Sequence, residues 1–376
     1  MVLAAIHAAM NFTRQLRVGS EYSIKIPTAL GPLFGRVLTR YLVWLVIFYG
    51  GFWLLRVSPF HAVPSYEANQ NFYAMFVYLY LVAGLPYFYI TLLCRASRRE
   101  DFYDPAVRIL HMLKQPILRF IRGDSLRSTL RVFRNRYNRK VILNLVMRAY
   151  FIPIMIMQVL TYLPFTLNLH SAVFDTHDFI TMLIWLGAML WLLDTVNAAL
   201  AYLLESRWLE NRSRSIDMTI TGWMVCFFCY EPLNNITGAF LPFAPFLATG
   251  NVDALIIPSN DFLVGLKIAE IILLSVHIYI DVGLGPSVAN ITLKKLQTRG
   301  PYALVRHPGT TTKLLFWFTV SFGYSEFWSA PFILGYLGWA ALYIARALTE
   351  ERHLRQHAEY RAYQQKVRYR FIPGVI

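Results

Sequence analysis

Long apolar runs separated by short polar stretches dominate the chain. A helix needs roughly 20 apolar residues to cross a bilayer, and runs of about that length lie at 38–57, 71–94, 141–163, 179–204, 216–248, 262–282, 311–325 and 331–348. The fifth run is longer than one crossing requires and is interrupted by Glu231-Pro232 and Asn234-Asn235, so we interpret it as one broken helix. The pattern predicts an all-α polytopic membrane protein with about eight transmembrane helices.

The composition agrees with this class. Of the 376 residues, 56% are hydrophobic and only 15% are charged, whereas soluble domains carry about 25% charged residues. A soluble enzyme, a disordered chain and a soluble nucleic-acid-binding protein are therefore excluded. The formal charge of +15 would suggest nucleic acid in a soluble protein, but beside a bilayer it indicates cytoplasmic loops. We expect no nucleic-acid partner.

Charge also predicts the orientation. If the N-terminus is cytoplasmic and eight spans alternate, all of the 36 Lys and Arg residues except Arg56 and Lys267 fall on the inner side or at inner span ends. Cytoplasmic loops carry such an excess, so both termini are expected in the cytoplasm. This gives three regions, which are a cytoplasmic or interfacial segment 1–36, a six-helix membrane region 37–282 and a C-terminal region 283–376.

The loop 95–140 is the most basic segment. Asp104-Pro105 predicts a helix start, and Ala106, Ile109, Leu110 and Leu113 follow with the spacing of one apolar helix face, which Pro116 interrupts. One interpretation is a helix pair resting on anionic lipid. The other is a dock for an acidic substrate headgroup.

Residues 299–308 read RGPYALVRHP, directly before the seventh run. Gly300-Pro301 predicts a turn, and Pro308 suits the first position of a helix. Arg306 and His307 would then lie beside a helix N-terminus, where free backbone N–H groups attract an anion and Arg306 could add a bidentate contact.

The second polar segment is residues 349–374, and no Pro or Gly occurs from Trp339 to Phe371. The eighth span is therefore expected to continue as a helix into the cytoplasm. Glu350 and Glu351 are neighbours that point about 100° apart, so one could face a cation while the other faces solvent; alternatively both lie on a solvated helix face. His353 and His357 have metal-ligand spacing, but no third ligand completes the set, so no metal is expected.

GPYALVRHP followed by EERHL and EYRAYQQKVRYRFIP resembles the isoprenylcysteine carboxyl methyltransferase family, a group of membrane methyltransferases that includes phospholipid methyltransferases. The resemblance is confined to about residues 283–376. It implies S-adenosylmethionine bound at the cytoplasmic face and methyl transfer to a lipid or lipidated acceptor from the bilayer. The residues that it assigns to the cofactor are Gly300, Pro301, Tyr302, Arg306, His307, Pro308, Tyr360 and Tyr363, and the catalytic candidates are Glu350, Glu351 and His307.

The chain departs from the family pattern in one place. After His307-Pro308 the family usually has Tyr and Gly where this chain has Thr310 and Thr312, followed by Lys313. Two other functions stay open. Membrane sterol reductases have a similar ending and use NADPH, although they carry a different turn before it, and a non-catalytic family member or a transporter would also fit.

Polar residues inside apolar runs are functional candidates because they are costly in lipid. In the sixth run Lys267, Glu270, His277 and Asp281 recur at helical spacing. The first two could neutralise each other, and the last two lie near the expected cofactor site. Asp194 and Asn197 in the fourth run could join helices by hydrogen bonds. The predicted acceptor pocket comprises His277, Asp281, Glu231, Asn234 and Asn235. We expect a multi-pass integral membrane protein, of the bacterial cytoplasmic membrane in preference to the endoplasmic reticulum.

Overall fold

The computed structural model describes residues 30–57, 64–93, 105–204, 211–242 and 251–375. Most of them are helical, as expected. The contacts divide the described residues into an N-terminal unit, which ends at Pro153, and a C-terminal unit, which begins at Ile154. Most of the predicted segment 1–36, and also Asp104, lie outside the described residues.

In the N-terminal unit, α2 (Leu30–Val57) and α3 (Pro64–Leu93) pack side by side. The rings of Tyr41 and Tyr80 stack with centroids 5.3 Å apart, and each hydroxyl donates to a carbonyl oxygen of the other helix. A Cβ atom at Gly84 would lie 2.9 Å from the Tyr41 ring. Glycine at this position therefore permits the stack.

The described part of the basic loop, from Pro105 on, forms three helices before the next long one. They are α5 (Pro105–Ile121), α6 (Leu126–Thr129) and α7 (Arg131–Arg134), and α8 (Arg136–Thr176) follows. The predicted start at Pro105 is confirmed. The expected interruption at Pro116 is wrong, because α5 continues through it to Ile121; a proline removes one hydrogen bond and can bend a helix without ending it.

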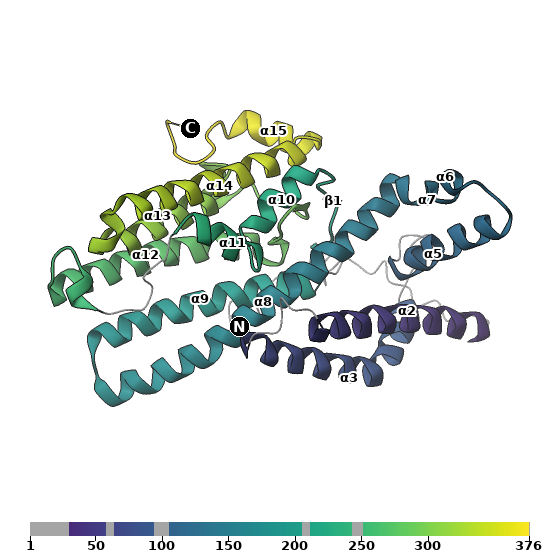
Figure 1. The fold of residues 1–376 in the computed structure, drawn as a ribbon, viewed down its shortest axis with the longest axis horizontal. Helices are drawn as coiled ribbons and strands as arrows, with labels where there is room; N and C mark the ends of the chain where they lie inside the picture. Colours follow the sequence, from purple (N-terminus) through teal and green to yellow (C-terminus); the bar gives the residue numbers. More distant parts are fainter. Residues whose placement is uncertain (1–29, 58–63, 94–104, 205–210, 243–250, 376) are drawn as a thin grey trace, which may run out of the picture. The chain divides into compact units, whose positions relative to one another are not determined.

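The C-terminal unit contains the end of α8 together with α9 (Phe179–Leu203), α10 (Ile220–Phe228), α11 (Leu233–Phe240), α12 (Asn260–Leu284), α13 (Pro308–Phe322), α14 (Ala330–Leu354) and α15 (Ala358–Lys366). Helix α12 packs against both α9 and α13, and α14 contacts α10 and α13 (Figure 1). Two short strands, β1 (Ser215–Ile216) and β2 (Thr292–Leu293), pair antiparallel. The described connections include the single-turn 3₁₀ helices η2 (Val252–Ala254), η3 (Gly285–Ser287), η4 (Gly300–Ala303) and η5 (Ser325–Trp328).

Six helices in the described part of the chain are long and apolar enough to cross a membrane. They lie at Leu33–Leu54, Gln70–Tyr89, Arg136–Thr176, Phe179–Leu203, Asn260–Ser287 and Ala330–Leu354. The fifth predicted run does not form one long helix, because α10 and α11 are separated at Cys229–Pro232. The seventh forms α13, whose 15 residues span about 22 Å at 1.5 Å each, less than the roughly 30 Å hydrocarbon core.

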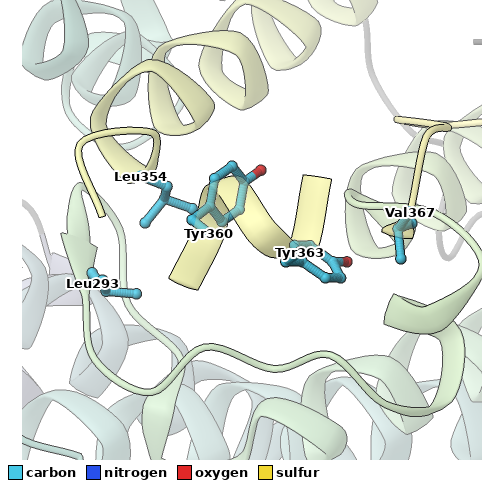
Figure 2. Packing of buried hydrophobic residues seen from close by; sticks show 5 residues of the cluster. All are labelled: Leu293, Leu354, Tyr360, Tyr363 and Val367. Atoms are coloured by element: carbon cyan, nitrogen blue, oxygen red, sulfur yellow. The ribbon is translucent and has the colours of Figure 1, made fainter. Parts of the chain in front are cut away.

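The last long helix continues beyond the predicted run 331–348, as expected, but it does not extend through the whole stretch that lacks Pro and Gly. Helix α14 ends at Leu354, and α15 begins at Ala358. The turn between them lets Tyr360 and Tyr363 pack among Leu293, Leu354 and Val367, as Figure 2 shows. Burial of two aromatic side chains against a distant strand stabilises the break.

Candidate functional site

A cavity of about 530 Å³ lies inside the C-terminal unit, with walls from α8, α9, α11, α12, α13, α14 and α15. It brings together most of the residues that the sequence analysis predicted separately for a cofactor and for an acceptor: Glu231, Asn234, His277, Asp281, Tyr302, Arg306, His307, Glu350, Tyr360 and Tyr363 all line it. The other predicted residues, Gly300, Pro301, Pro308, Glu351 and Asn235, are not among its lining residues.

The segment 300–308 takes the predicted form, a turn followed by a helix start. Gly300 has φ +61°, a left-handed conformation that glycine adopts without steric cost. Pro301 then opens η4, and His307 is the residue before the first turn of α13. The Tyr363 hydroxyl donates to the Tyr302 carbonyl oxygen at 2.6 Å, which fixes the turn against α15.

The C-terminal segment pairs the two N–H groups that lie just before α13. The backbone N–H groups of Arg306 and His307 donate to the carbonyl oxygens of Tyr369 and Arg370. These two groups are therefore not available to a ligand anion. Gly309 and Thr310, whose N–H groups have no intrahelical acceptor at a helix start, line the cavity instead.

Glu351 is the centre of an ion-pair cluster. Its side chain is 1% exposed, and its oxygens lie 3.2 Å from Arg306 Nη1, 3.2 Å from His307 Nε2, 3.0 Å from Arg355 Nη2 and 3.3 Å from Arg370 Nε. Glu350, one residue earlier, is half-buried and lines the cavity. The two carboxylates thus face different surroundings, as their spacing predicted, and the one that faces cations is Glu351.

This cluster changes the expected role of Arg306. One terminal nitrogen pairs with Glu351 and the other donates to the Arg368 carbonyl oxygen at 3.3 Å, so the bidentate contact with a ligand anion is not the arrangement seen. Arg306 Nε is buried and has no hydrogen-bond partner among the described residues. Nε–H is therefore a buried donor that a ligand could use.

The tyrosines at this end of the cavity are neutral hydrogen-bonding groups. Burial, with a smaller contribution from nearby carboxylates, raises the pKa of Tyr302 and of Tyr360 far above the usual range. Burial also raises the pKa of Tyr363 to about 12, against the opposing effect of Arg306. None of them ionises at physiological pH.

The predicted polar stripe on α12 separates into two pairs. Lys267 Nζ lies 3.0 Å from Glu270 Oε2, which confirms their mutual neutralisation. His277 Nδ1 lies 2.9 Å from the Thr312 hydroxyl, and its Nε2 lies 3.7 Å from Asp281 Oδ2. Only His277 and Asp281 line the cavity.

Helix α9 contributes a residue that the sequence analysis assigned another role. Asn197 donates to the Asp281 carbonyl oxygen at 3.4 Å, which confirms the expected bond between helices. Asp194, however, lines the cavity and offers a ligand atom within 4.8 Å of those of His277 and Asp281.

Two cavity cations were not predicted as site residues. Arg346 lies over the rings of Tyr230 and Tyr343 and donates to Asn290, and Lys313 lies over Tyr343 at 5.8 Å. Arg346 could have been noticed in the sequence because it is a charged residue close to the end of an apolar run. These cations make the middle of the cavity suitable for an anionic group.

Several polar atoms around the cavity lack a hydrogen-bond partner among the described residues. They are Trp191 Nε1, Asn234 Oδ1, His277 Nε2, Thr292 Oγ1, Arg306 Nε and Tyr360 Oη, all on lining residues. Buried polar groups in proteins are almost always paired. A cavity rimmed by such atoms is therefore a candidate ligand site.

Comparison with known proteins found no family model and no curated protein that matches this chain.

Proposed function

We propose that the chain is an integral-membrane methyltransferase that moves the methyl group of S-adenosylmethionine to a lipophilic or membrane-embedded acceptor bearing a carboxylate, thiol or amine. The observation that carries the proposal is the shared cavity. Residues of the two motif segments, Arg306 and His307 from one and Glu350, Tyr360 and Tyr363 from the other, line the same space as the acceptor candidates on α12.

The free groups at the motif end of the cavity suit the amino-acid part of this cofactor. Arg306 Nε is an unpaired donor for a carboxylate, and the Glu350 carboxylate lines the wall for an ammonium group. Tyr360 Oη adds a further unpaired hydroxyl. When bound, S-adenosylmethionine supplies a methyl group already activated on a sulfonium.

The protein's own contribution is alignment and exclusion of water. The apolar walls include Trp317 and Trp339, and Lys313 and Arg346 can position an acidic acceptor. A carboxylate or thiolate acceptor requires no base. An amine does require one, and the candidates are Glu350, Glu351 and His307; of these, Glu351 and His307 are paired with each other in the structure.

In this proposal α10 with α11, and α13, complete eight crossings, with both termini in the cytoplasm of a bacterial cell. Helix α5 rests on anionic lipid. It exposes Leu113, Ile117 and Phe120 next to the basic residues Lys114 and Arg119, and this combination favours a negatively charged membrane surface.

Calorimetry on the full chain in detergent tests the cofactor. We expect binding of S-adenosylmethionine, and in Glu350→Gln at least about tenfold weaker binding because a charged partner is lost. Lys366→Met, on an exposed part of α15, is the matched control and is expected to bind like the wild type. If S-adenosylmethionine does not bind, the proposal fails; if NADPH binds in its place, the chain is a reductase.

A second measurement identifies the acceptor. Cofactor labelled in its methyl group is incubated with membranes that contain the protein, and the lipid, protein and volatile fractions are counted. Label in the lipid or protein fraction that disappears with Glu350→Gln supports the proposal. Cofactor binding without label in any fraction indicates a non-catalytic relative.

A further inference from the structure

Three potential metal ligands meet in the membrane part of the cavity. Asp194 comes from α9, and His277 and Asp281 lie one turn apart on α12. One ligand atom of each lies within 4.8 Å of those of the other two. Two oxygen ligands and one nitrogen ligand therefore converge from two packed helices.

The hydrogen bonds of Thr312 assign the proton on His277. The Thr312 hydroxyl donates to the Pro308 carbonyl oxygen at 3.0 Å. Its contact of 2.9 Å with His277 is then one in which Nδ1–H donates and the hydroxyl accepts. The neutral ring consequently carries a lone pair on Nε2.

That lone pair points at negative charge. Nε2 lies 3.7 Å from Asp281 Oδ2, too far for a hydrogen bond, and no described residue pairs with it. The His277 side chain is only 4% exposed. An unprotonated nitrogen and two carboxylates that face one another in a buried site repel unless a cation or a shared proton lies between them.

We propose that Asp194, His277 and Asp281 bind a divalent transition-metal ion, with Thr312 as a positioning residue. Imidazole with carboxylates suits Zn²⁺ or Mn²⁺ better than Mg²⁺, which prefers oxygen alone, or soft ions, which prefer thiolates. Metal-bound histidines commonly use their second nitrogen to donate a hydrogen bond that fixes the ring, and Thr312 accepts that bond here. All three ligands line the cavity, so an acceptor or water in it could complete the coordination of the ion.

The main competing arrangement involves Lys313. Asp194 and Asp281 interact directly, and Lys313 acts electrostatically on both. The two carboxylates could therefore share a proton and pair with this lysine without a metal. Removal of Lys313 distinguishes the two arrangements. The positive charge of Lys313 repels a metal ion, so its removal should strengthen metal binding. The same charge stabilises the carboxylates in an ion pair, so its removal should destabilise the arrangement without metal.

The test measures metal and does not depend on methyl transfer. The full chain is purified in detergent, equilibrated with Zn²⁺ or with Mn²⁺, and dialysed, and its metal content is determined by mass spectrometry. We expect about one ion per chain in the wild type and in His170→Ala, an exposed histidine on α8, and loss of the ion in His277→Ala and Asp281→Asn. Thr312→Val is expected to weaken binding by about 10- to 100-fold, and Lys313→Met to strengthen it.

Two results would overturn the proposal. One is a wild-type chain without metal after both equilibrations, in which case Lys313→Met should also lower the thermal stability. The other is equal metal content in the wild type, His277→Ala and Asp281→Asn, which indicates an adventitious ion only. If His277→Ala does not fold, the metal affinities of Thr312→Val and Lys313→Met are measured by titration against a competing chelator. Weaker binding in the first and stronger binding in the second support the proposal, and unchanged affinities in both overturn it. Because cofactor binding is measured separately by calorimetry, failure of one proposal leaves the other intact.

Discussion

Helix α12 carries two buried ionisable pairs that differ in how their charges are compensated. Lys267 and Glu270 are separated by three residues, and Nζ lies 3.0 and 3.3 Å from the two carboxylate oxygens. His277 and Asp281 are separated by four residues, approach only to 3.7 Å, and have Asp194 beside them. The charges of the first pair neutralise each other within the helix, whereas the negative charge of the second pair requires a cation or a proton from outside the helix.

The difference separates a structural pair from a ligand site. Isolated charges are expensive in lipid, so a pair that neutralises itself allows the helix to cross and needs no further function. Lys267 and Glu270 fall outside the lining of the cavity, and His277 and Asp281 form part of it. All four residues of the polar stripe lie on α12, but only His277 and Asp281 lack an ion-pair partner within hydrogen-bond distance in the described part of the chain and also line the cavity. These two properties together, and not burial alone, identify them as the ligand-binding pair.

The largest expected effect comes from breaking the compensated pair. Lys267→Met leaves Glu270 buried without its partner, and removal of one member of a buried ion pair typically costs about 3–5 kcal/mol. Chemical unfolding of the detergent-solubilised protein measures the loss. The double variant Lys267→Met with Glu270→Met is the control and should recover most of it, because replacement of both charges by apolar groups is often neutral. A single variant as stable as the wild type would show that the pair is not a structural element.

Glu351 extends the comparison to the other end of the unit. It is compensated by three arginines and His307, and we expect Glu351→Gln to lower the unfolding free energy by about 2–3 kcal/mol through weaker charged hydrogen bonds. Glu350→Gln is the matched isosteric neighbour on the cavity side and should change stability by less than about 0.5 kcal/mol. Thermal unfolding of both variants checks this, and equal losses would contradict the assignment of different roles to the two carboxylates.

Much of the helical architecture could be predicted from the chain, because apolar runs of bilayer length report directly on long helices. The break after Leu354 could not. It depends on Tyr360 and Tyr363 packing against Leu293, a contact across more than sixty positions that local propensity does not encode. The break between α10 and α11 was visible in advance, because Glu231-Pro232 interrupts the run locally.

The site was predictable where its residues share one helix. His277 and Asp281 stood out through their spacing, but Asp194 joins them only because α9 packs on α12. Thr312 was noticeable as a departure from a motif, while its contact with His277 is a tertiary one. The contacts of Arg306 and His307 with the C-terminal segment were not visible in the sequence for a similar reason, since the carbonyl oxygens that accept from their N–H groups belong to the distant residues Tyr369 and Arg370.

The smallest expected effect concerns the uncompensated pair in the absence of metal. His277→Leu removes one hydrogen bond to Thr312 and leaves that hydroxyl bonded to Pro308, so in chelator we expect a loss of about 1 kcal/mol or less. Added Zn²⁺ or Mn²⁺ at about 100 times its dissociation constant should stabilise the wild type by about 2.7 kcal/mol and leave His277→Leu unchanged. Unfolding curves with and without metal measure both quantities. A loss in chelator as large as that of Lys267→Met would mean that both pairs on α12 are structural, and the distinction between them would disappear.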